Sequence, residues 1–215
     1  MIHVETFPVP PLGCNCSVLR DDATGEAIVI DPGGDAAGIL RRLKASGATV
    51  KAIVHTHTHI DHVGATAAVQ RETGAPARIH EGDLFLYEML PVQGQLLGMR
   101  APPSAELDAF LRDGESLTAG GLALEVIHTP GHTPGSVCFR CRVGERDTLF
   151  AGDTLFAGSI GRTDLWGGDS EAILRSIRER LLTLADDTVV ITGHDRATTI
   201  GRERRSNPYV RTVGA

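Results

Sequence analysis

The chain has 215 residues, of which 41% are hydrophobic and 22% are charged, and this is the composition of an ordinary globular domain. A chain of this length buries enough surface to fold alone, so disorder, collagen and coiled coil are excluded. The formal net charge of −6 argues against nucleic acid as a partner, because phosphate binding needs a concentrated positive surface.

Short runs that are rich in branched residues predict eight strands, at residues 2–7, 16–19, 27–30, 50–54, 122–127, 136–141, 148–150 and 189–191. Helical spacing of apolar residues follows Asp35 and again follows Asp169. Residues 88–114 are interrupted by proline and glycine and predict a long excursion over the active site. The apolar side chains in and beside this excursion are candidate pocket walls, namely Phe85, Tyr87, Leu96, Leu97 and Met99. Strands that alternate with helices indicate two packed sheets with helices outside them.

The first residues of the chain carry neither a basic nor an apolar segment, and no run approaches 18 apolar residues. We therefore expect a cytoplasmic protein without a membrane partner. The four cysteines, at positions 14, 16, 138 and 141, are too few for a disulfide framework. A zinc site built from them is disfavoured, because Cys138 and Cys141 would point to opposite faces of one strand.

Four of the nine histidines fall within eight residues, in the sequence His-Thr-His-Thr-His-Ile-Asp-His at positions 55–62. Chance would produce the pattern His-x-His-x-Asp-His in about one such chain in a thousand. Imidazole nitrogens and carboxylate oxygens suit zinc, iron and manganese. Three later turns place His132, Asp153 and His194 close to glycines after strands, where separate segments can converge on a metal.

This set of motifs resembles the metallo-β-lactamase superfamily and, within it, the glyoxalase II (hydroxyacylglutathione hydrolase) branch. The likeness extends from the sequences at 13–16 and 30–34 to that at 198–208, and the Gly-Ser-Ile-Gly-Arg-Thr-Asp segment at 158–164 is similar to the short bacterial relatives. The resemblance implies an α+β fold, a four-layer αββα sandwich with metals at one edge between the sheets. It also implies a single hydrolase domain over residues 1–215, without the C-terminal helical domain of full-length glyoxalase II.

The same resemblance implies two divalent metal ions, zinc with iron or manganese as alternatives, held by seven residues. One ion would take His57, His59 and His132, the other would take Asp61, His62 and His194, and Asp153 would bridge them. Of the remaining histidines, His55 and His128 are interpreted as polar neighbours or hydrogen-bond donors to the site, and His3 and His80 receive no role.

A dinuclear site of this kind predicts hydrolysis, because metal coordination lowers the pKa of water to roughly 7 and a bridging hydroxide can attack a polarised carbonyl. Asp61 is the expected catalytic residue, since it would orient that hydroxide. A thiolate leaves without a separate acid, so the expected substrate is a small thioester of the S-lactoylglutathione type. Arg162, Arg202 and Arg205 are candidates for binding its carboxylate, and the alternative for the last two is a solvated terminal helix.

Persulfide dioxygenases share this fold and the Gly-Arg-Thr-Asp segment at 161–164, and they tend to follow the last histidine with an aspartate, as Asp195 does here. In that alternative, one iron is held by His57, His132 and Asp153 and glutathione persulfide is oxidised. The sequences at 156–160 and 166–169 favour the hydrolase instead. Lactonase and β-lactamase activities fit the same site, whereas a metal-binding protein without catalysis is disfavoured because no ligand is missing.

Overall fold

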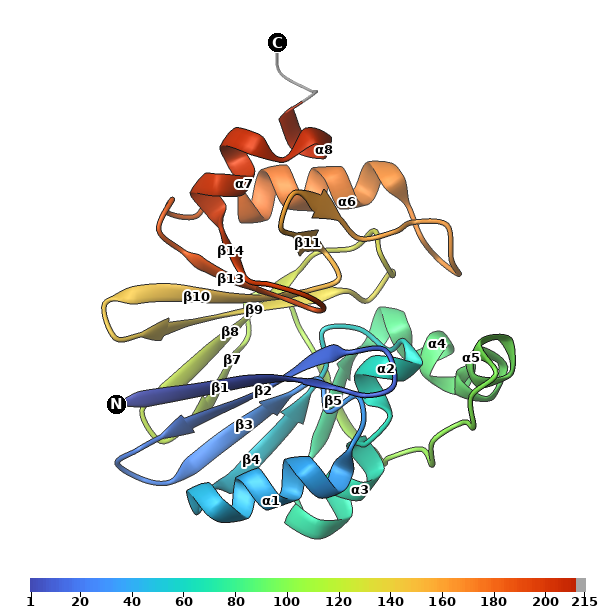
Figure 1. The fold of residues 1–215 in the computed structure, drawn as a ribbon, viewed down its shortest axis with the longest axis vertical. Helices are drawn as coiled ribbons and strands as arrows, with labels where there is room; N and C mark the ends of the chain where they lie inside the picture. The colour runs from blue at the N-terminus through green and yellow to red at the C-terminus, as the bar shows by residue number, and fades with distance from the viewer. Residues whose placement is uncertain (212–215) are drawn as a thin grey trace.

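The structure of the protein is a computed structural model, which describes residues 1–211. It has two six-stranded sheets packed face to face (Figure 1). The first sheet has the order β1 (Ile2–Val9), β2 (Cys14–Asp21), β3 (Glu26–Ile30), β4 (Thr49–Val54), β5 (Ala77–His80) and β6 (Leu107–Leu111). The second has the order β14 (Thr198–Thr199), β13 (Val189–Thr192), β10 (Arg146–Gly152), β9 (Val137–Val143), β8 (Leu122–His128) and β7 (Ser116–Ala119). A small hairpin joins β11 (Leu155–Phe156) to β12 (Ser159–Ile160).

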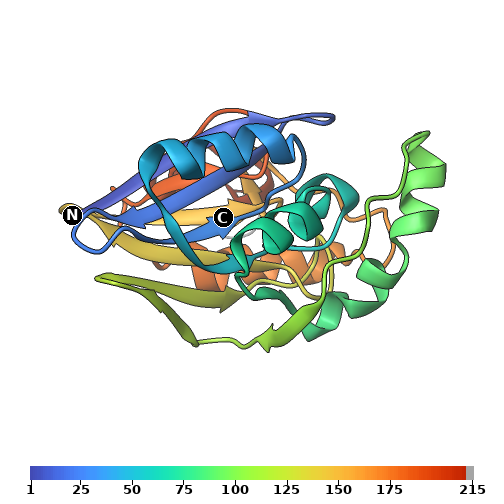
Figure 2. The same ribbon diagram turned by 90° about the horizontal axis from the view of Figure 1, so that it is seen from below.

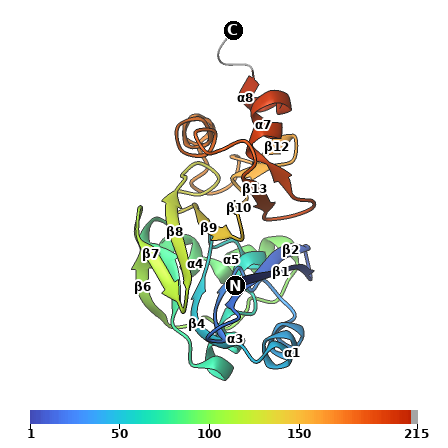
Figure 3. The same cartoon turned by 90° about the vertical axis from the view of Figure 1, so that its left-hand side faces the viewer.

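Helices cover the outer face of each sheet, as Figures 1 and 3 show. The first sheet is covered by α1 (Ala36–Ser46) and α3 (Thr66–Thr73), and the second by α6 (Ser170–Ser176), the π-helical turn η2 (Ile177–Leu181), α7 (Ile200–Ser206) and α8 (Pro208–Arg211). One end of the sandwich carries α2 (Ile60–Val63), η1 (Glu81–Asp83), α4 (Leu84–Glu88) and α5 (Leu90–Leu97), the last of which projects at the side in Figure 2. The predicted α+β, αββα architecture is therefore confirmed.

Three apolar layers hold the sandwich together. Between the sheets, Ile28 and Val54 pack with Phe139. Other layers join each sheet to its helices, and each fully buried aliphatic or aromatic side chain there stabilises the fold by about 1.5 to 3 kcal/mol. Cys138 and Cys141 belong to different layers, which confirms that they face opposite sides of β9. Among the described residues, no helix combines the length and the apolar character that a membrane span requires.

All eight predicted strands are present, with ends that differ by at most two residues. The helix starts are also confirmed, because Asp35 accepts a hydrogen bond from the backbone of Gly38 and Asp169 caps α6 in the same way. Residues 88–114, predicted as a long excursion broken by proline and glycine, include two short regular elements. This stretch contains α5 and β6, since Gln93 fixes the helix through tertiary hydrogen bonds and β6 pairs in parallel with β5.

Strand direction brings the carboxyl ends of β3, β4, β8, β10 and β13 to one end of the sandwich, and β5 and β6 run parallel to β4. In the first sheet, β3 and β4 are parallel. In the second, β10 is parallel to β13, and β8 runs the same way because both are antiparallel to β9. The loops after these five strands therefore meet at the end that α2, α4 and α5 cover (Figure 1). These loops carry the histidines and aspartates of the predicted site.

Candidate metal centre

The side chains of the predicted ligands come from four loops. His57 and His59 follow β4, and Asp61 and His62 lie on the short helix α2. The other three, His132, Asp153 and His194, follow β8, β10 and β13. Close approach of the backbone makes this convergence possible, since a Cβ atom on Gly33 would lie 1.6 Å from the carbonyl oxygen of Asp61. Only glycine therefore lets the turn after β3 lie against α2.

The seven side chains meet in two groups. In the first, Nε2 of His132 lies 3.2 Å from Nε2 of His57 and 3.0 Å from Nδ1 of His59. In the second, Nε2 of His194 lies 3.4 Å from Nε2 of His62 and 3.2 Å from Oδ2 of Asp61. Within each group the ligand atoms lie within 4.8 Å of one another, so each could hold a metal ion.

Asp153 lies between the two groups and turns one oxygen to each. Its Oδ2 is 3.7 Å from Nε2 of His132, whereas its Oδ1 is 3.6 Å from Nε2 of His62 and 3.8 Å from Nε2 of His194. Oδ1 is buried and has no hydrogen-bond partner among the described residues. A buried carboxylate oxygen without a donor is costly, and a cation between these ligand atoms would satisfy it. The residues present therefore fit a pair of metal ions.

Three of the ring nitrogens that face away from the cluster contact other groups, whereas Nε2 of His59 is buried without a partner among the described residues. Nδ1 of His62 lies 3.0 Å from Oδ2 of the buried Asp31, and Nδ1 of His132 donates to the backbone oxygen of Arg162 at 2.8 Å. The hydroxyl of Thr56 lies 3.1 Å from Nδ1 of His57. Partners of this kind fix the ring orientation and direct the opposite nitrogen toward a metal.

The electrostatics of the cluster favour neutral imidazoles around the first group. Burial, together with the neighbouring histidines, lowers the pKa of His57 well below its usual range and that of His59 to about 3. Neutral imidazole has the free lone pair that a metal needs. Burial opposes the ionisation of Asp61, yet His62 and His194 outweigh it and lower the pKa of this carboxyl. Asp61 therefore stays ionised near neutral pH.

Two buried side chains that the sequence did not single out join the ligand loops. Asp83, at the end of η1, accepts hydrogen bonds from the backbone of Thr58, the hydroxyl of Thr133 and the backbone of Gly135, at 3.0, 2.9 and 2.6 Å. The amide of Gln93 accepts from the backbone of Ile60 at 2.9 Å and donates to the oxygens of two other residues. Their partners are distant in sequence, so no local signal could have found them.

A cavity of about 280 Å³ opens onto the cluster. Its lining includes Arg162 and the apolar side chains Leu96, Leu97 and Trp166, so two of the predicted wall residues and one of the predicted arginines lie there. The other predicted wall residues do not line it. Tyr87 instead packs in the small core beneath α2, Met99 packs against that core, and Phe85 is 39% exposed.

The two remaining predicted arginines are on α7, and neither lines this cavity. Arg205 makes an ion pair with Asp186 at 3.1 Å, and Arg202 is exposed. The other four histidines lie outside the cluster: His55 contacts the hydroxyl of Thr66 at 2.7 Å, the ring of His128 stacks on that of His80, and His3 is on β1.

Comparison with known proteins gives the same picture over nearly the whole chain. Residues 9–194 match the metallo-beta-lactamase superfamily. The chain is 42% identical to the hydroxyacylglutathione hydrolase GloC of Haemophilus influenzae, with 97% of this chain and 98% of that protein covered. It is 38% identical to the probable metallo-hydrolase YqgX of Bacillus subtilis, with 95% of each chain covered.

Solved structures agree. The BLEG-1 B3 metallo-beta-lactamase superposes with a TM-score of 0.89 at 39% identity, over 99% of this chain and 100% of that one. TTHA1623 in a di-iron-bound form gives 0.83 at 35% identity, over 95% and 99%. ETHE1 from Myxococcus xanthus gives 0.77 at 26% identity, over 96% and 83%. The chain therefore belongs to the metallo-beta-lactamase superfamily.

Proposed function

We propose that this protein is a metal-dependent hydrolase of small thioesters, of the hydroxyacylglutathione type, and that it works with two divalent metal ions. The observation that carries the proposal is the position of Asp153, whose two oxygens face two separate groups of ligand atoms. The name of the Haemophilus influenzae relative supports the substrate class. We further propose that residues 1–215 act as one hydrolase domain, since both sheets supply ligands.

In this proposal one ion, most simply zinc, is held by His57, His59 and His132, the other by Asp61, His62 and His194, and Asp153 contacts both. When bound, two divalent ions lower the pKa of water and polarise a carbonyl oxygen. Iron and manganese accept the same ligands, and the di-iron form of TTHA1623 supports a pair of ions in this fold.

The residues of the chain supply orientation and proton handling. The ionised carboxylate of Asp61 can accept a hydrogen bond from the attacking water and direct its lone pair at the substrate carbonyl. The apolar side chains of Leu96, Leu97 and Trp166 line the cavity beside it and fit an acyl group. A thiolate of ordinary pKa leaves without a protonated side chain, so no separate general acid is required.

We also propose that the protein works in the cytoplasm. All four cysteines are free and buried, as expected in a reducing compartment.

A second candidate function is oxidation of a glutathione persulfide by one iron. The structural likeness to ETHE1 of Myxococcus xanthus favours it, and so does Asp195 after the last histidine. His57, His132 and Asp153 would be the ligands, and the structure brings these three side chains together.

Metal analysis paired with two assays separates these functions. The purified protein is analysed for its metals and then assayed with S-lactoylglutathione in a cell fitted with an oxygen electrode. The hydrolase proposal expects about two ions per chain, thiol release and no oxygen uptake. One iron per chain, with oxygen consumed when glutathione persulfide is added, would replace the hydrolase with the dioxygenase.

A further inference from the structure

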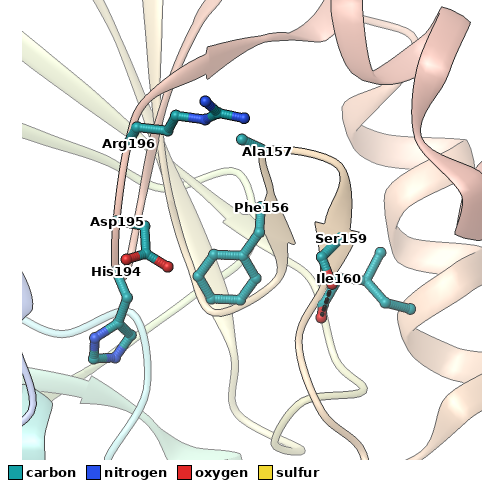
Figure 4. Close-up of a pocket in the computed structure, with 7 residues that line it drawn as sticks. All are labelled: Phe156, Ala157, Ser159, Ile160, His194, Asp195 and Arg196. Atoms are coloured by element: carbon teal, nitrogen blue, oxygen red, sulfur yellow. Dashed lines mark hydrogen bonds between the residues drawn. The ribbon is translucent and has the colours of Figure 1, made fainter.

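A second cavity, of about 680 Å³, lies beside the metal centre and shares His194 with it. One wall is the loop after β13, which carries Asp195 and Arg196, and the opposite wall is the β11–β12 hairpin with Phe156 and Ser159 (Figure 4). Because His194 belongs to both cavities, a substrate held at the metal centre can extend one arm into this second cavity.

The second cavity carries one positive and one negative side chain that do not neutralise each other. Asp195 and Arg196 are both exposed, and Figure 4 shows the carboxylate directed toward Phe156 and the guanidinium reaching toward Ala157. Among the described residues, neither charged group has a hydrogen bond or an ion pair. Both are free to bind a ligand.

Two of the three arginines predicted from the sequence differ in this respect, and the third, Arg202, lines neither cavity. The guanidinium of Arg162 is held by both oxygens of Asp164, at 2.7 and 2.8 Å, and Arg205 is paired with Asp186. A substrate carboxylate would have to compete with these partners. Arg196 has no such competitor and lies two residues from a proposed metal ligand.

The backbone beneath the two charges is fixed. The side-chain amide of Asn15 donates to the oxygens of Thr192 and Asp195 at 2.9 and 3.0 Å, and the hydroxyl of Thr192 donates to the oxygen of Arg196 at 3.3 Å. Asp195 is held at φ +62°, in the left-handed region that non-glycine residues adopt rarely. Strain retained at a rigid loop is typical of positions with a binding role.

We propose that Asp195 and Arg196 bind an α-amino acid group on the thiol part of the substrate, with Arg196 taking the carboxylate and Asp195 the ammonium. The proposal rests on the thioesterase function above and assigns the residues that select its thiol carrier. An α-amino acid carries its ammonium and its carboxylate on the same carbon, two consecutive residues supply the opposite charges here, and guanidinium can bind a carboxylate through two parallel hydrogen bonds. A fixed loop lowers the entropy lost on binding.

Kinetics with three matched thioesters test the proposal on the metal-loaded protein. They are S-lactoylglutathione, the same compound with its amino group acetylated, and the same compound with its γ-glutamyl α-carboxylate converted to an amide. Arg196→Gln is expected to raise KM for S-lactoylglutathione about tenfold, as loss of a charged hydrogen bond predicts, with kcat within twofold. Arg196→Gln should also erase the preference for S-lactoylglutathione over the amide compound.

Asp195→Asn gives the complementary test, because asparagine tolerates the left-handed backbone and removes only the charge. Asp195→Asn should erase the preference for S-lactoylglutathione over the acetylated compound. Arg196→Lys should have a KM for S-lactoylglutathione between those of the wild type and Arg196→Gln. Arg146→Gln is the matched control, since Arg146 is also exposed but begins β10 at the end opposite Asp153. Wild-type preferences that survive in Arg196→Gln and Asp195→Asn would overturn the proposal.

A binding measurement keeps this test separate from the proposed reaction. S-methylglutathione has no bond to hydrolyse, and Trp166, the one tryptophan of the sequence, lines the adjacent cavity and reports binding by fluorescence. Weaker binding in both variants, with no thioester turned over by the wild type, would refute the thioesterase and retain the binding site. Unchanged binding in both variants, with normal turnover, would refute the binding site and retain the thioesterase.

Discussion

Oδ2 of Asp31 lies 3.0 Å from Nδ1 of His62, while the same carboxylate accepts hydrogen bonds from the backbone and the hydroxyl of Thr56 at 2.7 and 2.6 Å. One buried anion therefore orients a histidine of the second ligand group and also the residue that contacts His57. Asp31 follows β3, on a different loop from both of its partners. The candidate metal centre is therefore contacted on two sides by a residue that is not a proposed ligand.

We predict that Asp31→Asn lowers the affinity for one metal ion by about 10- to 100-fold, because the His62 ring loses its charged partner. Metal content is measured after dialysis against a series of chelator concentrations. Asp22→Asn, at an exposed position, is the control and should retain both ions. Equal retention in the two variants would show that Asp31 does not support the site.

Substitution of the proposed ligands tests the mechanism directly. Asp61→Ala and His59→Ala should each abolish thioester hydrolysis, since one removes the water-orienting carboxylate and the other a ligand of the first ion. Both variants should keep the wild-type far-ultraviolet circular dichroism spectrum. Near-normal turnover in either one would contradict the dinuclear mechanism.

A methyl group at Gly193 should disable the site by a steric route. A Cβ atom there would lie 2.0 Å from Oδ1 of Asp153 and 2.8 Å from the backbone carbon of Gly152. The carboxylate between the two ligand groups must then move, so Gly193→Ala should lose at least about 100-fold in kcat/KM, a loss of the size seen when a catalytic group is misplaced.

The matched control for that variant is Gly144→Ala, in the β9–β10 turn. Gly144 has φ +60° and open space around its Cα, so alanine should cost about 1 kcal/mol of stability and leave activity unchanged. Thermal unfolding and steady-state kinetics are compared for the two variants. A Gly193→Ala protein as active as Gly144→Ala would show that Asp153 can shift without consequence.

Removal of metal should abolish activity without unfolding the chain. The apolar layers between the sheets and beneath the helices contain none of the seven proposed ligands, so the core does not depend on the ions. Circular dichroism before and after chelator treatment measures the fold, and re-addition of zinc should restore activity. Loss of the spectrum on chelation would identify the site as structural.

The sequence predicted eight of the strands, because runs of branched residues are a local signal, and the resemblance to the metallo-β-lactamase superfamily implied the seven proposed ligands. The other strands, β5, β6, β7, β11, β12 and β14, were not predicted. For example, β7 is only four residues long, and its alternation of exposed and buried residues is too brief to stand out. The helix α5 was also not predicted, because Pro91 and Gly94 weaken its local signal. Hydrogen bonds of the Gln93 side chain to other segments hold this helix in place.

The residues that support or extend the site were beyond sequence analysis for a different reason. Asp31 and Asp83 bind partners that are 25 to 52 positions away along the chain. Arg196 lines a cavity whose opposite wall, the β11–β12 hairpin, comes from an earlier part of the chain, so no local sequence signal marks it. The sequence instead favoured cations on α7, one of which the fold pairs with Asp186.

The shifted pKa of Asp83 should make the free energy of unfolding depend on pH. Burial raises the pKa of this carboxyl to about 6 despite its three hydrogen bonds, and the ordinary value is 3.8. Between these two values the folded state holds a proton that the unfolded state has released. Stability from this group is therefore full below about pH 3.8 and is lost as the pH rises through 6.

We predict that the unfolding free energy of the metal-depleted wild type contains a term from Asp83 that falls by about 2 kcal/mol between pH 4.5 and pH 7.5. Asp83→Asn lacks this term, so the difference in stability between the two proteins should change by that amount across the range. Urea unfolding at both pH values measures it. A constant difference would mean that Asp83 has the same pKa in both states, and that the Thr58 and Thr133 hydrogen bonds fully offset its burial.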